Sequence, residues 1–111
     1  MFGRDMLRGS LELMVLSVLA DGTTYGYRIL QRLAEASGGR VELKAGTLYP
    51  ILHRLEARGA VRSRWDSTTG RDRKWYALTA AGRKALRHEA DEWFAYAKCV
   101  QGLLRPALRA I

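Results

Sequence analysis

The chain contains little cysteine and no long uninterrupted apolar run. Its only cysteine is Cys99, so no disulfide can form within the chain and no cysteine-rich metal site is expected. We therefore expect a reducing compartment, the cytoplasm. The densest apolar stretch, residues 11–20, is interrupted by Glu12 and Ser17 and is shorter than the roughly 20 residues that span a bilayer. The first residues lack a cleavable signal pattern, so neither export nor a membrane span is predicted.

Patterns typical of catalysis are also missing. The glycines occupy expected turns and helix ends, and no phosphate-cradling loop, paired carboxylates or nucleophile–base arrangement is evident. His53 and His88 do not have the spacing of metal ligands. We therefore expect no enzyme, no metal site and no cofactor.

Acidic residues are few relative to basic ones. Nineteen Lys and Arg against eleven Asp and Glu give a net charge of +8 at pH 7. Such a balance suits a polyanionic partner, either nucleic acid or an anionic membrane surface. The length of 111 residues and the apolar fraction of 48% predict one folded domain with a modest core.

Two helices are predicted in the first part of the chain. Ser10 can cap a helix that runs to about Ala20 and is apolar nearly all round, which suggests a subunit contact. Thr23 or Thr24 can cap a second helix that ends at residues 37–39, where glycine suits a left-handed C-terminal cap. Only a short connection separates it from a third helix, as in a helix-turn-helix.

The third helix contains a proline within an apolar pattern. Pro50 in a helix interior would cost about 3 kcal/mol, so the sequence predicts a helix that begins just before it, with Thr47 as N-cap. The helix should end at residues 58–59. One face follows the i, i+3, i+4, i+7 spacing of a buried stripe: Leu48, Ile51, Leu52 and Leu55.

A β-hairpin is predicted after the third helix. Apolar and polar side chains alternate over residues 61–65, and residues 74–78 are rich in aromatic and apolar side chains. The segment DSTTGRD between them has the composition of a loop. Two strands joined by a basic loop after a helix-turn-helix form a wing. The expected fold is therefore mainly α with a small β-hairpin, a winged helix-turn-helix.

A last helix is predicted after Thr79, which can serve as its N-cap. Its apolar residues step by 4, 3, 4, 3, 4 until Pro106, and a heptad seam that extends beyond a complete domain needs a cover. We predict a winged helix-turn-helix domain over residues 1–79 and a dimerisation helix over residues 80–111. The seam comprises Leu86, Ala90, Trp93, Ala97, Val100 and Leu104.

Three blocks together resemble the PadR family of bacterial transcriptional regulators. LRGSLELMVLSVLADGTTYGYRI, GTLYPILHRLEARGAV and GRDRKWYALTAAG occur in the family's order within about residues 7–105. The short C-terminus is similar to the compact subgroup with a single C-terminal helix. The resemblance implies a homodimeric repressor of double-stranded DNA, often released by a small molecule. The chain departs from the family at Tyr25, where histidine is frequent, at Trp75, where tyrosine is frequent, and at Asp72, which interrupts the basic wing.

The candidate DNA-binding residues lie on the third helix and on the hairpin. The third helix of this fold enters the major groove, where base edges are read. Tyr49 can donate to a phosphate oxygen, although a half-buried rim position is the simpler alternative. The hairpin cations suit phosphate or minor-groove contact, or else form only a solvated face. The full set is Lys44, Thr47, Tyr49, His53, Arg54, Arg71, Arg73 and Lys74.

Trp93 and Cys99 lie on the last helix. Packing is the favoured role for Trp93, because large aromatics at heptad spacing are usually packing residues. The alternative is that two copies of Trp93 flank a pocket for a small aromatic effector. Cys99 is expected to be a small buried hydrophobe. We predict a DNA-binding regulator, most simply a homodimeric repressor with a pseudo-palindromic operator; the alternative is a non-specific nucleic-acid-binding protein without an effector.

Overall fold

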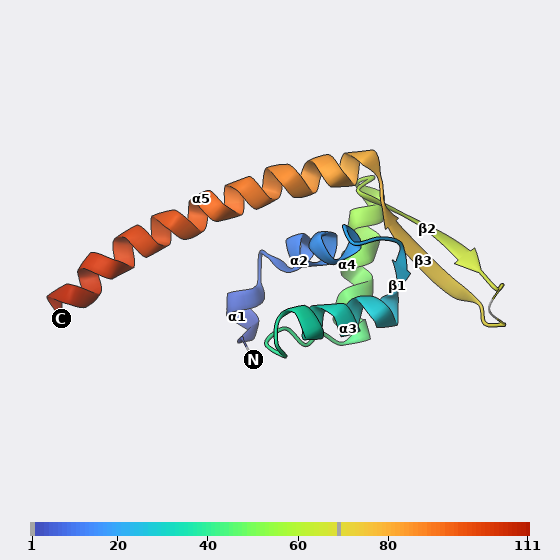
Figure 1. Cartoon of the computed structure of the whole chain (residues 1–111), viewed down its shortest axis with the longest axis horizontal. Helices are drawn as coiled ribbons and strands as arrows, with labels where there is room; N and C mark the ends of the chain where they lie inside the picture. The colour runs from blue at the N-terminus through green and yellow to red at the C-terminus, as the bar shows by residue number, and fades with distance from the viewer. Residues whose placement is uncertain (1, 69) are drawn as a thin grey trace.

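The computed structural model describes residues 2–68 and 70–111, without the side chains of Arg4 and Asp5. Thr69, part of the predicted hairpin loop, lies outside the described residues. The described elements confirm a mainly α winged helix-turn-helix (Figure 1). In order they are α1 (Arg4–Leu7), α2 (Leu11–Leu19), β1 (Thr24–Tyr25), α3 (Gly26–Ala36), α4 (Ala45–Ala57), β2 (Val61–Asp66), β3 (Arg73–Leu78) and α5 (Ala80–Ala110).

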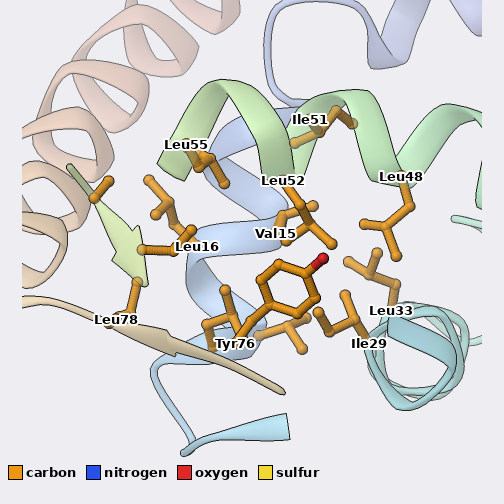
Figure 2. Packing of buried hydrophobic residues seen from close by; sticks show 14 of the residues in the cluster. Val15, Leu16, Ile29, Leu33, Leu48, Ile51, Leu52, Leu55, Tyr76 and Leu78 are labelled. Carbon is orange, nitrogen blue, oxygen red and sulfur yellow. The ribbon is translucent and has the colours of Figure 1, made fainter. Parts of the chain in front are cut away.

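The core lies where α2, α3 and α4 meet the inner face of the sheet. Figure 2 shows the ring of Tyr76, from β3, among side chains of these three helices. The predicted stripe of α4 is buried as expected. Each fully buried Leu or Ile stabilises the fold by about 1.5–3 kcal/mol, so this stripe fixes which side of α4 faces outward.

The start of α4 differs from the prediction. The helix begins at Ala45 after Lys44, so Thr47 is not its N-cap and Pro50 lies inside the helix. A helical proline loses one hydrogen bond and its ring crowds the carbonyl four residues earlier, here that of Gly46. Full burial of Leu48, worth about 1.5–3 kcal/mol, requires the extra first turn and offsets much of that cost.

A short strand, β1, was not predicted. Thr24 pairs with Tyr76 and Tyr25 with Trp75 in an antiparallel ladder, which makes a three-stranded sheet of order β1-β3-β2. The prediction that Thr23 or Thr24 caps the following helix is wrong, because Tyr25 holds the N-cap position in an extended conformation. Two residues are too few to show a period of two, and their partners lie about fifty positions further along the chain.

The ends of the other early helices agree with the predictions in position. Ser10 holds the N-cap position of α2, but its hydroxyl donates to the Leu7 carbonyl instead of capping the helix. The helix α3 ends at Ala36, followed by the predicted glycines. The helix α4 ends at Ala57, and the positive φ of 78° at Gly59 lets the chain turn into β2.

The two faces of the hairpin have different surroundings. Val61, Ser63 and Trp65 share one face with their partners Leu78, Tyr76 and Lys74. This inner face packs on α4, and the Ser63 hydroxyl donates to the Glu56 carboxylate at 2.6 Å. The outer face carries Arg62, Arg64, Arg73 and Trp75. The base of the wing is thus fixed to the core, while its tip extends beyond it.

The helix α5 begins as predicted and then leaves the domain. The Gly82 amide donates to the Thr79 hydroxyl at 2.9 Å, and this hydroxyl donates to the Gly59 carbonyl at 2.6 Å. The helix continues through Pro106 and projects away from the other elements (Figure 1). Cys99 is exposed, so its predicted burial is wrong for the single chain, because no other described segment covers that part of α5.

Candidate nucleic-acid interface

The helix α4 presents one polar side to solvent. Lys44, just ahead of α4, and the side chains of Thr47, Tyr49, His53 and Arg54 are exposed, opposite the buried leucine stripe. All five predicted positions therefore lie on the free side of the segment. Tyr49 is partly engaged in packing, because its hydroxyl lies so close to Gly26 that a Cβ at that glycine would overlap it.

An open groove of about 520 Å³ separates α4 from the wing, and we call it the α4–wing groove. It brings together five of the predicted residues, namely Tyr49, His53, Arg71, Arg73 and Lys74. It excludes Lys44, Thr47 and Arg54, which lie elsewhere on the same side of the protein. Its remaining lining comprises Tyr25, Gly26, Tyr27, Trp65, Asp72 and Tyr76. The groove is therefore both aromatic and basic.

The two aromatic departures from the family pattern are neighbours in space. Tyr25 and Trp75 are paired across β1 and β3, with ring centroids 5.2 Å apart in an edge-to-face arrangement. The Arg73 guanidinium lies 4.3 Å from the centre of the Tyr25 ring. Such a cation–π contact is worth about 0.5–1 kcal/mol at an exposed site and restricts the arginine to the outer face of the wing.

Lys74 projects from the inner face instead. It is paired with Trp65, and its Nζ lies 5.9 Å from the centre of the Tyr76 ring. Burial raises the pKa of Tyr76 above its usual value, and the nearby phenol of Tyr49 adds to this. Tyr76 therefore stays a neutral phenol at physiological pH, and Lys74 supplies positive charge on this wall.

The turn after β2 is stabilised by an aspartate. The Thr68 amide donates to Asp66 at 2.8 Å, and this hydrogen bond, with a smaller contribution from Arg64, lowers the pKa of Asp66 below its usual value. The carboxylate therefore stays ionised at neutral pH and neutralises part of the charge of Arg64, 3.5 Å away. The positive charge near the wing tip thus depends mainly on Arg71, Arg73 and Lys74.

Acidic residues engage the basic side chains at the other end of α4. Glu12 of α2 lies 3.6 Å from Arg54 and 3.9 Å from Arg58, and Glu89 of α5 lies 2.7 Å from Arg58. Arg54, a predicted DNA contact, is thus ion-paired while its side chain stays mostly exposed. These pairs join residues up to 77 positions apart in the chain. Local sequence patterns give no signal for them.

Two exposed aromatics of the groove were not among the predicted residues. Trp65 and Tyr27 expose 68% and 63% of their surfaces. The alternation over residues 61–65 does place Trp65 on the same face as Val61, which is buried. What the pattern could not show is that this face extends past the core at Trp65.

Within residues 2–68 and 70–111, no three His, Cys, Asp or Glu side chains gather in a way that could hold a metal ion. Over the same residues, no helix is long and apolar enough to cross a membrane. His88 and Glu92, one turn apart on α5, are paired at 2.5 Å.

The fold and this surface define a winged helix-turn-helix protein. The model of the transcriptional regulator PadR-like family matches residues 15–88. The chain belongs to this family and is a transcriptional regulator. The transcriptional regulator Rv3488 of Mycobacterium tuberculosis is 41% identical over 86 residues, which cover 78% of each chain. An uncharacterized protein of Lysinibacillus sphaericus is 30% identical over 80% of this chain and 83% of its own.

Solved structures agree. A transcriptional regulator from Clostridium thermocellum is 30% identical, with a TM-score of 0.82 over 88% of this chain and 96% of its own. A PadR family transcriptional regulator from Eggerthella lenta is 35% identical, with a TM-score of 0.81 over 91% of this chain and 87% of its own. The resemblance seen in the sequence blocks is confirmed.

Proposed function

We propose that this regulator is a homodimeric repressor that binds a pseudo-palindromic operator through α4 and the wing. The observation that carries the proposal is the α4–wing groove, where His53 and Tyr49 face Arg71 and Lys74 across an open channel. The free side of α4 is positioned for base edges in the major groove, and the wing cations for phosphates. Because the proposed partner is chromosomal DNA, we infer that the protein acts in the cytoplasm.

The dimer is inferred from α5. Trp93 and Leu104 of the predicted seam are 45% and 52% exposed, and further apolar side chains lie on the same side of the helix. Three that flank the seam are Tyr96, Leu103 and Leu108. An apolar stripe this wide is normally buried, and a second copy with the same stripe can cover it by coiled-coil packing. Two-fold symmetry would then present two α4 helices to one face of DNA.

A small aromatic effector is the least supported part of the proposal. Trp93 contacts Phe94 edge to face, with ring centroids 5.8 Å apart, and both rings are largely exposed in the single chain. In a dimer through α5, two copies of Trp93 near the two-fold axis could hold a flat ligand between them, or could pack on each other. A ligand that quenches Trp93 fluorescence and weakens operator binding would support the first role.

The proposal is tested by fluorescence anisotropy with three labelled nucleic acids: the protein's own promoter, a random duplex and an RNA. A repressor with an operator binds the promoter most tightly. The variant Lys74→Ala should weaken binding to both duplexes, while Lys98→Ala, an exposed lysine on α5, serves as the control. Equal affinity for all three nucleic acids would favour the alternative, a non-specific binder.

A further inference from the structure

Trp65 has an unusual position for a tryptophan. It lies on the inner face of the wing, yet 68% of its surface is exposed because the hairpin extends past the end of the core. It lines the α4–wing groove on the wall opposite Tyr49 and His53, and its cross-strand partner is Lys74. A single exposed apolar residue is ordinary by itself. Here the exposed ring stands beside a cation in the groove that carries the proposed function.

The geometry of the duplex determines what enters this groove. If α4 occupies the major groove and the wing the adjoining minor groove, one sugar–phosphate strand separates the two protein elements. That strand must then lie in the α4–wing groove. It offers two chemical surfaces, which are the anionic phosphate oxygens and the largely apolar face of each deoxyribose. Lys74 is suited to the first and the indole of Trp65 to the second.

We propose that Trp65 packs against a deoxyribose of the strand that lies in the α4–wing groove, while Lys74 binds the adjoining phosphate. This inference rests on the proposed DNA-binding function and adds a contact that is not electrostatic. The contact is made with the backbone, so it contributes affinity to every duplex and does not discriminate between sequences.

The two kinds of contact respond differently to salt. Loss of a phosphate contact lowers the slope of log K against log salt, because fewer counterions are released on binding. Loss of an apolar contact leaves that slope unchanged and lowers affinity by the same factor at each salt concentration. Packing of an aromatic ring on nucleic acid typically contributes enough for a loss on the order of 10-fold when the ring is removed.

The test is a salt titration of duplex binding by the full chain and the variants Trp65→Ala, Trp65→Phe and Lys74→Ala. We expect Trp65→Ala to bind promoter and random duplexes roughly 10-fold more weakly with an unchanged slope, and Trp65→Phe to recover most of the loss. Lys74→Ala should lower the slope by about 1. Since Trp65 is mostly exposed, the melting temperature of Trp65→Ala should stay that of the wild type.

Fluorescence gives an independent readout. The chain has three tryptophans, so Trp75→Phe with Trp93→Phe leaves Trp65 as the only emitter. Its emission should change when duplex DNA is added. Wild-type affinity in Trp65→Ala at all salt concentrations, or an emission that duplex does not change, would overturn the contact while leaving the proposed function intact. Failure of the wild type to bind any duplex would overturn both.

Discussion

Arg58, at the end of α4, donates to the carboxylate of Glu89 on α5 at 2.7 Å. The pair joins the helix proposed to read DNA to the helix proposed to form the dimer. It lies just before α5 projects away from the domain (Figure 1). The angle between these two helices would set the spacing of the two α4 helices in a dimer, and Arg58–Glu89 is the ion pair that bridges them directly.

Replacement of Glu89 by glutamine should have a small, salt-dependent effect. Both side chains are about one-third exposed or more, so the expected loss in unfolding free energy is below about 1 kcal/mol. The loss should shrink as salt screens the pair. Urea unfolding at low and high salt measures it, with Asp91→Asn, an exposed carboxylate on α5, as the control. An equal loss in both variants, or a loss that salt does not change, would contradict the role of the pair.

Gly82 should not tolerate a side chain. A Cβ there would overlap the Ala60 carbonyl, which is backbone held in the turn between α4 and β2. We expect Gly82→Ala to destabilise the fold by about 1–3 kcal/mol, as overpacking does. Gly102→Ala is the matched control on the same helix, because nothing lies within 4 Å of its Cβ position. It should stabilise the chain by about 0.5–1 kcal/mol, and thermal unfolding that ranked the two variants the other way would refute this account.

The dimer should depend on the far half of α5. Val100→Asp with Leu104→Asp would bury two charges in the seam and should yield a monomer at micromolar concentration. These positions make no part of the core cluster, so helical content should be retained. Light scattering and circular dichroism distinguish dissociation from unfolding. A monomeric wild type under the same conditions would reject the dimer.

Arg73 should contribute to DNA binding through charge. Arg73→Ala is expected to weaken binding to all duplexes alike and to lower the salt slope by about 1. The substitution also removes the cation–π contact with Tyr25, so Tyr25→Ala is the control that loses the contact but keeps the charge. Unchanged affinity of Arg73→Ala at every salt concentration would show that this side of the wing does not touch DNA.

Local patterns predicted the elements whose information lies within a few residues. The leucine stripe of α4, the alternation of β2, the Thr79 cap and the heptad spacing of α5 all follow from the periods of helix and strand. The order of these elements then gave the winged helix-turn-helix.

Tertiary contacts determined what the sequence analysis missed. The strand β1 exists because β3 offers it a partner, and burial of Leu48 moves the start of α4 ahead of Pro50. The ion pairs of Glu12 and the close approach of Tyr49 to Gly26 also join distant segments. At Trp65 the alternation correctly gave the face of the strand, but not where the core beneath it ends.

The central claim is sequence-specific binding by a two-fold dimer through the free side of α4. A footprint on the protein's own promoter, with wild type and the double variant His53→Ala, Tyr49→Phe, tests it most directly. We predict two symmetric half-sites centred about one helical turn apart, roughly 10 bp or a multiple of it. The double variant should lose on the order of 1–3 kcal/mol of preference for promoter over random DNA per lost base contact, with little change in its affinity for random DNA. A single unpaired footprint, or an undiminished promoter preference in the double variant, would contradict the account.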